Sequence, residues 1–144
     1  MVEEALQTTA ERVRDWLWAR DHATRSLGME VVAVAPGRAT LSMRVREDML
    51  NGYQLCHGGC IASLADSAFA YACNACNERT VASGFGIEFL APAHLGDLLT
   101  AHCVESFRGS RTGLYDVEIL NQTGKRVAVF RGRSYAIKGR AAVD

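Results

Sequence analysis

The feature that most constrains this chain is one carboxylate, Asp66, in the middle of the apolar segment from Asn51 to Cys73. Apolar side chains recur in this segment with the spacing of a largely buried helix. Burial of a lone carboxylate costs several kcal/mol unless the group is paired or partly hydrated. Asp66 is therefore expected to have either a structural partner, such as a hydroxyl or a backbone amide, or a chemical role. The face of this helix that is predicted to be buried carries Ile61, Leu64, Ala65, Ala68 and Ala72.

Asp66 projects from a second face of the predicted helix, and this face is lined by small residues. Small side chains around an ionisable group leave room for a ligand or another backbone to approach. Its other members are Gly59, Ala62, Ser63, Ala70 and Cys73.

The predicted start of this helix follows His57 and carries two glycines, Gly58 and Gly59. First-turn amides have no partner within a helix and point outward with the positive end of the helix dipole behind them. Glycine leaves such an amide accessible, as an oxyanion hole requires. A plain turn is the alternative interpretation of His-Gly-Gly taken by itself.

Asn51, His57, the two glycines and Asp66 together form the pattern N-x5-HGG-x6-D on a central helix. This pattern resembles the hotdog-fold acyl-CoA thioesterases, specifically the phenylacetate-degradation (PaaI-type) branch. The resemblance covers about residues 27 to 138. It includes MLNGYQLCHGG, SLADSAFAYACN, VASGFGIEFLAPAHLGD, TGLYDVEILNQ and VAVFRGRS.

The resemblance implies hydrolysis of the thioester of a coenzyme A conjugate, with an aryl-acetyl group such as phenylacetyl or hydroxyphenylacetyl as the acyl part. Asp66 matches the catalytic carboxylate, and Gly58 the glycine whose amide stabilises the oxyanion. Asn51 and His57 match residues that hold the thioester end of the substrate. Some relatives orient water with a hydroxyl in the next strand; the aligned position here is Ala82, with Ser83 beside it. The expected substrate-binding residues are Gly59, Ser83, Gly84, Phe85, Arg108, Ser110, Arg111 and Thr112.

No cofactor and no metal is expected, since coenzyme A is part of the substrate. Formal net charge is zero, but residues 108 to 144 hold 8 basic and 3 acidic side chains, against 8 and 13 before them. The balanced total argues against a nucleic-acid partner. The local basic excess suits the phosphates of coenzyme A, and Arg108 and Arg111 are the candidates; a solvated strand face is the alternative.

The length of 144 residues and a hydrophobic content of 49% predict one hotdog thioesterase domain over 1–144, with residues 1–26 as a helical extension. No segment resembles a signal peptide or a membrane span, so no membrane partner is expected. Five cysteines, an odd number, suit a reducing compartment, and we expect a cytoplasmic protein. Cys73 and Cys76 have CxxC spacing, for which redox chemistry or a zinc site is the minor alternative.

The order of the predicted elements indicates an α+β domain. This order matches the hotdog fold that the resemblance implies, in which a curved antiparallel sheet surrounds one long helix. In residues 80–90, Val81, Phe85, Ile87 and Phe89 are expected on one face and Ala82, Gly84, Gly86 and Glu88 on the other. Two glycines on one face indicate close approach of a ligand or partner, or a β-bulge. The expected elements are a helix over 8–26 capped by Thr8 or Thr9, strands over 31–35 and 39–46, a connector over 47–56, the central helix ending near 74–77, and strands over 80–90, 97–107, 112–120 and 125–138. The first two strands are expected to form a hairpin through Pro36 and Gly37, and apolar and polar residues alternate along 39–46, so this strand should have one apolar face and one solvated face.

Helix geometry places Gly58 and Asp66 roughly 12 Å apart along the axis, too far for one chain to present both to one carbonyl. We therefore expect a two-fold homodimer with antiparallel central helices, as the resemblance also implies. Beyond this geometric argument, we expect two such dimers to associate as a homotetramer. Asp66 acts either as nucleophile or as general base, and the sequence leaves both routes open. The alternatives to hydrolysis are an acyl-thioester dehydratase or hydratase that uses His57, and a non-catalytic acyl-CoA-binding module.

Overall fold

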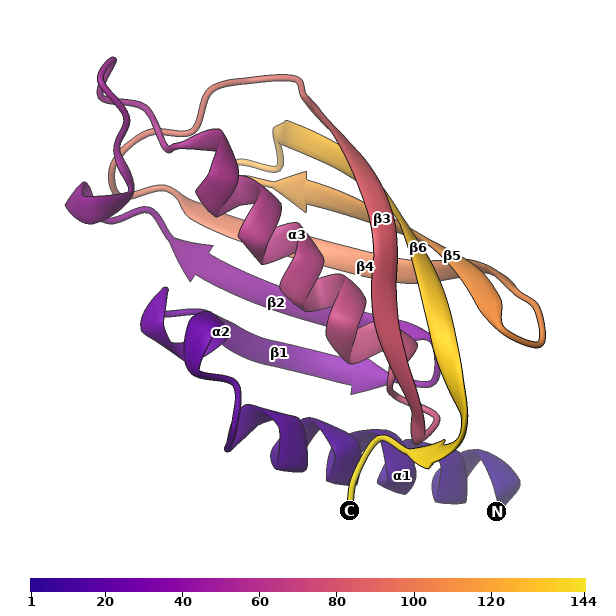
Figure 1. The fold of residues 1–144 in the computed structure, drawn as a ribbon. Helices are drawn as coiled ribbons and strands as arrows, with labels where there is room; N and C mark the ends of the chain where they lie inside the picture. The colour runs from indigo at the N-terminus through magenta and orange to yellow at the C-terminus, as the bar shows by residue number, and fades with distance from the viewer.

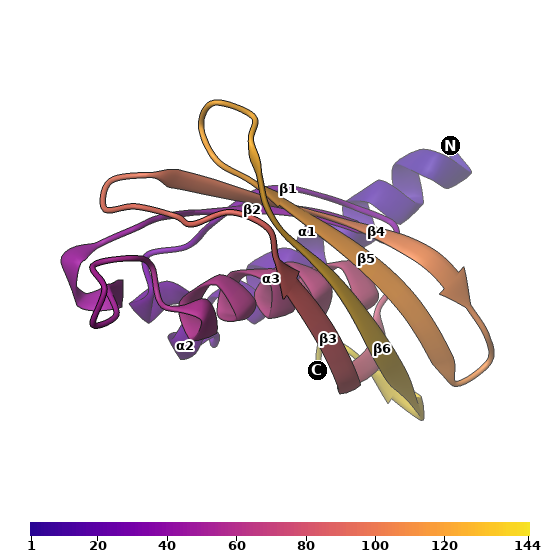
Figure 2. The ribbon, with the colours of Figure 1, turned by 90° about the horizontal axis from the view of Figure 1, so that it is seen from above.

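One curved sheet and one long helix dominate the fold, which a computed structural model describes for all residues from 1 to 144. The six strands lie in the order β1-β2-β4-β5-β6-β3, and each neighbouring pair is antiparallel. Helix α3 lies in the hollow of the sheet (Figure 1, Figure 2), which confirms the expected α+β hotdog arrangement. The elements are α1 (Val2–Trp18), α2 (His22–Ser26), β1 (Glu30–Ala35), β2 (Arg38–Arg44), a 3-10 turn (Glu47–Met49), α3 (Gly58–Cys73), β3 (Glu78–Phe89), β4 (Leu98–Arg108), β5 (Thr112–Leu120) and β6 (Arg126–Ala141).

Helix α3 is held by the core that it shares with the inner face of the sheet. The five residues predicted to be buried are all 3% exposed or less, and they pack with side chains of β2, β4 and β5 such as Leu41, Leu99 and Ile119. Full burial of one such Leu or Ile side chain contributes about 1.5–3 kcal/mol. Asn74 then ends the helix: its side chain donates to the Ala70 carbonyl at 2.9 Å and accepts from the Thr80 amide at 2.9 Å. The predicted end of the helix near 74–77 is thus confirmed.

The first hairpin also follows its sequence pattern. Strands β1 and β2 meet at the turn formed by Pro36 and Gly37, and Gly37 takes a positive φ of 68° that glycine adopts without strain. Along β2, Ala39, Leu41 and Met43 are buried, and the residues between them are partly exposed. The expected alternation of one apolar face and one solvated face is confirmed.

The N-terminal segment differs from the single helix predicted over 8–26. Helix α1 begins at Val2, so the Thr8 and Thr9 hydroxyls donate to the carbonyls of Glu4 and Ala5 inside the helix, at 2.9 and 3.0 Å, instead of capping its start. The chain then breaks, and Asp21 caps a second helix by accepting from the Thr24 amide at 3.2 Å. Helix α1 lies along β1, outside the hollow of the sheet (Figure 1). None of the helices combines the length and the apolar character needed to cross a membrane.

Strand β3 contains a register shift that the sequence pattern did not locate. Between Ala82 and Gly84 the strand advances two residues while β6 advances one, which makes Ser83 a β-bulge. The bulge reverses the alternation, so Val81 lies opposite Tyr135, which is 41% exposed, whereas Phe85 lies opposite the buried Gly132. The prediction that Val81 shares a face with Phe85, Ile87 and Phe89 is therefore wrong. β3 also forms one edge of the sheet.

Candidate active site

The start of α3 presents one backbone amide without a partner. His57 caps the helix, and its Nδ1 atom accepts a hydrogen bond from the Gly59 amide at 3.0 Å. The His57 amide is itself fixed by the Met49 carbonyl at 2.7 Å. The Gly58 N–H lies between these two groups and donates to no acceptor in the chain. A free donor at the positive end of a 16-residue helix is suited to stabilise an oxyanion.

A pocket of about 380 Å³ opens beside this amide. The ring of Phe89 lies over Gly58, and a side chain at position 58 would place its Cβ 3.0 Å from the ring. Glycine therefore leaves the amide accessible, and a side chain at this position would crowd the Phe89 ring. The pocket is mostly apolar, which suits an acyl group. Its lining is Asn51, Leu55, Cys56, Gly58, Ile61, Phe89, Leu90, Ala91, Pro92 and Ala93.

Asn51 combines a role in loop structure with a position in this pocket. Its Oδ1 atom accepts from the amides of Tyr53 and Leu55 at 2.9 and 3.1 Å, which shapes the loop before α3. The Nδ2 group makes no hydrogen bond within the chain, and it is the part of Asn51 that can meet a substrate. The structure thus brings Asn51, His57 and Gly58 together at one end of α3.

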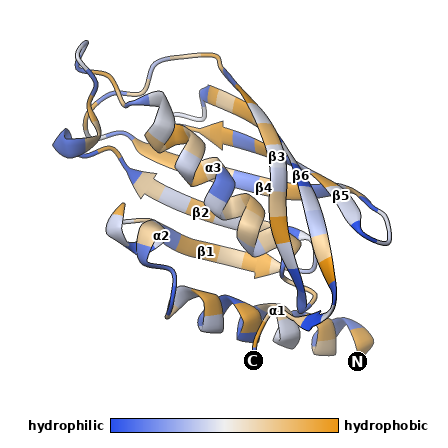
Figure 3. Ribbon diagram, viewed as in Figure 1, coloured by the Kyte–Doolittle hydropathy of each residue, from blue (hydrophilic) through white to orange (hydrophobic).

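Asp66 lies midway along α3, half-buried and without any hydrogen bond or ion pair. The neighbouring hydroxyls are engaged elsewhere: Ser63 donates to the Gly59 carbonyl at 2.8 Å, and Ser67 bonds the Thr24 hydroxyl at 2.8 Å. The structural interpretation, in which a hydroxyl or amide pairs with Asp66, is therefore wrong for this chain. Burial raises the pKa of Asp66, and the negative charge of Asp21 raises it further. Figure 3 shows a hydrophilic band midway along an otherwise pale or apolar α3.

The structure does not bring Asp66 to the Gly58 pocket of its own chain. Asp66 is not among the residues that line this pocket. The two residues are eight positions apart on one continuous helix, which separates them by about 12 Å along its axis. One chain presents the donor and the carboxylate as two separate half-sites.

The predicted binding residues of β3 lie at the bulge on the edge of the sheet. The Ser83 hydroxyl donates to the Arg133 carbonyl and accepts from the Arg133 side chain, both at 3.1 Å. The Phe85 ring lies 4.8 Å from that of Phe130 between centroids, and Phe85 remains 49% exposed. Neither Ser83, Gly84 nor Phe85 reaches the Gly58 pocket.

The predicted phosphate-binding residues lie on the β4–β5 hairpin, near the opposite end of α3. Arg108 and Arg111 line a small cleft together with Cys73 at the end of that helix. Arg108 forms an ion pair with Glu78 at 3.5 Å, and the Arg111 side chain lies 3.5 Å from the Tyr135 hydroxyl. Ser110 lies at the exposed tip, and Thr112 begins β5. This group is therefore remote from Gly58 of the same chain and closer to Asp66.

Two features of the site escaped the sequence analysis. Phe89 was assigned to a strand face, although the apolar run from Phe89 to Ala93 directly after the strand is a usable signal for a pocket wall. Asp21 was assigned to the interior of the helix over 8–26, and nothing in the sequence indicates that it lies near Asp66. Cys73 and Cys76 are free thiols, as are the other three cysteines. No three His, Cys, Asp or Glu side chains come together as possible metal ligands.

Comparison with known proteins gives consistent matches. Residues 53–128 match the family described as Thioesterase superfamily. Acyl-coenzyme A thioesterase PaaI of Escherichia coli K12 is 46% identical over 123 residues, which are 85% of this chain and 88% of that protein. The structure of the E. coli PaaI protein from the phenylacetic acid degradation operon matches with a TM-score of 0.92 and 44% identity, over 94% of this chain and 98% of that chain.

Two further solved structures match over most of their own length. A mutant of the phenylacetic acid degradation protein PaaI from Thermus thermophilus gives a TM-score of 0.77 and 36% identity, over 79% of this chain and 97% of that chain. A protein from Streptococcus mutans, bound to acetyl CoA, gives a TM-score of 0.75 and 25% identity, over 78% of this chain and 90% of that chain.

Proposed function

The chain belongs to the thioesterase superfamily and is a thioester hydrolase, and on this premise we propose that its substrate is the coenzyme A ester of an aryl-acetyl group. Phenylacetyl-CoA and its hydroxylated forms are the candidates, since the E. coli relative is an acyl-coenzyme A thioesterase and its structure is described as coming from a phenylacetic acid degradation operon. The products are the free acid and coenzyme A.

The observation that carries the proposed mechanism is that one helix presents both a free amide, at Gly58, and a free carboxylate, at Asp66. The Gly58 N–H is the donor that stabilises the developing negative charge on the thioester oxygen. Asp66 either removes a proton from the attacking water or attacks the carbonyl carbon itself to give a mixed anhydride, which water then opens. In both routes the carbon–sulfur bond breaks, and its electron pair leaves with the sulfur, which takes up a proton.

His57 serves this mechanism as the cap of α3. Its Nδ1 atom is occupied by the Gly59 amide, and this bond aligns the turn that exposes Gly58. Only the Nε2 side of the ring remains for a substrate. This arrangement disfavours the dehydratase alternative, in which His57 is the acid/base group and the unpaired Asp66 has no role.

We propose that the complete site forms between two chains. Antiparallel packing of two α3 helices would bring Asp66 of the partner subunit to the Gly58 amide, and small residues around Asp66 permit that approach. The outer edge of β3 is unpaired, so the two sheets can join there, and two such dimers would form the tetramer. In this assembly Arg111, with Ser110 and Thr112 beside it, is placed to bind the nucleotide phosphates of a substrate whose thioester lies beside Asp66 of the same chain.

Replacement of Asp66 with Asn tests the assignment of the carboxylate. Asp66→Asn removes charge and basicity with little change of volume, so the fold should persist while kcat for phenylacetyl-CoA falls by at least ~10²-fold. Release of free thiol from a panel of aryl-acetyl, benzoyl and straight-chain acyl-CoA esters measures both the loss and the substrate preference. Activity of Asp66→Asn within a few-fold of the unmodified enzyme would remove Asp66 from the mechanism. Single-turnover hydrolysis in ¹⁸O water tests for the anhydride route, because label enters Asp66 only when water opens a mixed anhydride at the Asp66 carbonyl carbon.

A further inference from the structure

Helix α2 is fixed against α3 directly beside Asp66. The Thr24 hydroxyl, in a residue only 2% exposed, bonds the Ser67 hydroxyl at 2.8 Å. The Tyr71 hydroxyl donates to the Asp21 carboxylate at 3.2 Å. Ser67 and Tyr71 are four residues apart on α3 and so share one face of the helix, which is rotated by roughly 100–140° from Asp66. α2 therefore packs on the face of α3 that adjoins the face of Asp66.

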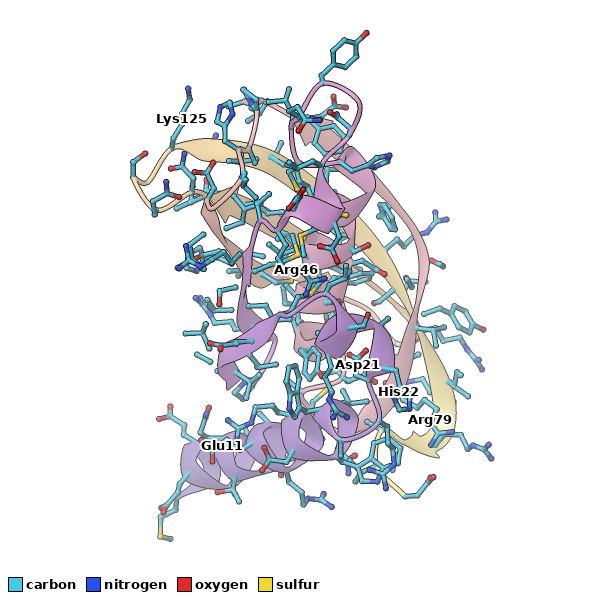
Figure 4. The ribbon with its side chains drawn as sticks, turned by 90° about the vertical axis from the view of Figure 1, so that its left-hand side faces the viewer. Glu11, Asp21, His22, Arg46, Arg79 and Lys125 are labelled. Carbon is cyan, nitrogen blue, oxygen red and sulfur yellow. The ribbon has the colours of Figure 1, made fainter.

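The Asp21 carboxylate is held by both of its oxygens. Oδ1 accepts the Thr24 amide at 3.2 Å, which caps α2, and Oδ2 accepts the Tyr71 hydroxyl at 3.2 Å. The other end of α2 is tied to the connector before α3, where Arg46 donates to the Ser26 carbonyl at 3.1 Å and pairs with Asp48 at 3.0 Å. Figure 4 shows Asp21 and His22 at the start of α2, with Arg46 beside the same helix and Glu11 well away on α1.

The electrostatic neighbourhood of Asp66 is dominated by this one charge. Burial is the larger cause of the raised pKa of Asp66, and Asp21 is the ionisable side chain that raises this pKa further. Two turns along α3, the pKa of Cys73 is raised by burial and, to a smaller extent, by the charge of Asp66. The charge of Arg25 on α2 acts on Tyr71, whose pKa it lowers against the larger effect of burial. No cation from any element pairs with Asp66, and Asp21 has no salt bridge that would neutralise it.

We propose that Asp21 is a positioning residue of the thioesterase site, which α2 and Tyr71 hold beside α3 so that its negative charge makes Asp66 a stronger base or nucleophile. Placing two carboxylates near one another is unfavourable for folding, and the chain uses Thr24, Ser67 and Tyr71 to maintain this arrangement. A carboxylate needed only as a helix cap would not require a second bond from α3. The inference rests on the proposed role of Asp66.

The test is Asp21→Asn, which removes the charge with little change of shape. Asn caps helices as well as Asp does: its one side-chain oxygen can keep the bond from the Thr24 amide, and its Nδ2 group can donate to the Tyr71 hydroxyl, which no longer acts as the donor. We expect the acid limb of the pH profile of kcat/KM to move to lower pH by about 0.5 unit, because loss of a nearby like charge favours the ionised form. The plateau should fall about twofold, since a weaker base transfers protons less effectively. The two profiles should therefore cross.

Glu11→Gln is the matched control, since it removes the same unit of charge from the exposed face of α1 and should leave the profile unchanged. An NMR titration of the Asp66 carboxyl carbon in ¹³C-Asp-labelled protein measures the same shift without turnover. If Asp66 titrates at the same pH in Asp21→Asn as in the unmodified protein, or if Glu11→Gln shifts it equally, the inference is overturned. If Asp66→Asn remains active but Asp66 titrates lower in Asp21→Asn, the proposed mechanism fails while the electrostatic role of Asp21 stands.

Discussion

At the scale of the residue, the chain keeps Asp66 ionisable at a cost to folding. The carboxylate is half-buried, has no partner and faces the charge of Asp21. Burial in the first place, and Asp21 in the second, raise its pKa above the ordinary 3.8. The stability contributed by Asp66 is therefore full below the pKa of the unfolded chain, and it is lost as pH rises through the raised pKa of the folded chain. Asn has the same shape as Asp but does not ionise, so Asp66→Asn avoids this loss of stability.

Asp66→Asn should therefore raise the thermal midpoint at pH 7 while it abolishes activity. The gain should shrink as pH falls and disappear at a pH where Asp66 is protonated in both the folded and the unfolded state. Thermal scans of both proteins from pH 3.5 to 8 measure this difference. A midpoint that drops at pH 7 would mean that Asp66 makes a stabilising contact, contrary to its lack of partners. Glu11→Gln, on the exposed side of α1 and in no ion pair, controls for the change in net charge.

At the scale of the element, close contact between β6 and α3 fixes where the helix lies. Gly132 on β6 faces Phe69 of α3, and a Cβ at position 132 would lie 2.8 Å from two atoms of that ring. Phe69 is 1% exposed and packs against Tyr115 and Phe130, so its ring has no space to move into. The glycine thus sets the distance between the sheet and the helix that carries Asp66.

Gly132→Ala should lower the free energy of unfolding by about 1–3 kcal/mol, the usual cost of an overpacked core. Gly86→Ala on the neighbouring β3 is the control, because a Cβ there meets no atom within 4 Å. Chemical denaturation of the two variants measures the difference. Equal stability of both would show that the helix can shift away from the sheet.

Periodicity predicted these elements well where one side of an element is buried. The α3 face from Ile61 to Ala72 and the alternation along β2 are both confirmed, because burial imposes a strict period. The same reasoning failed at β3, where the Ser83 bulge shifts the register by one residue and moves Val81 to the other face. It failed also at residues 19–21, where the break before α2 depends on the Asp21 cap and on contacts with α3, which lie far away in the chain.

The sequence predicted the two candidate catalytic groups, the Gly58 amide and the Asp66 carboxylate, but not the residues that surround them. The glycine pair after His57 and the single carboxylate in α3 are both visible as patterns, and the structure places them on one helix as expected. Phe89 and Asp21 lie in segments that are distant in sequence from α3. The apolar run from Phe89 to Ala93 is a usable signal for a pocket wall, whereas no local pattern indicates that Asp21 lies near Asp66. The assignments of Arg108 and Ser83 to substrate binding stay predictions, and both side chains are held by contacts within the chain.

At the scale of the whole molecule, the central claim is that one active site takes Gly58 from one chain and Asp66 from another. The most direct measurement is the activity of mixed dimers of an Asp66→Asn chain and a Gly58→Val chain, purified by two different tags. Each variant alone should be inactive, the first without its carboxylate and the second with a side chain between Phe89 and the Gly58 amide.

In the mixed dimer, one site carries both lesions and the other carries neither. The account predicts that each confirmed heterodimer hydrolyses phenylacetyl-CoA at about half the rate of the unmodified dimer, as expected when one of two equivalent sites is intact. If heterodimers are confirmed by mass and show no recovery of activity, each site draws both groups from the same chain, and the account is contradicted.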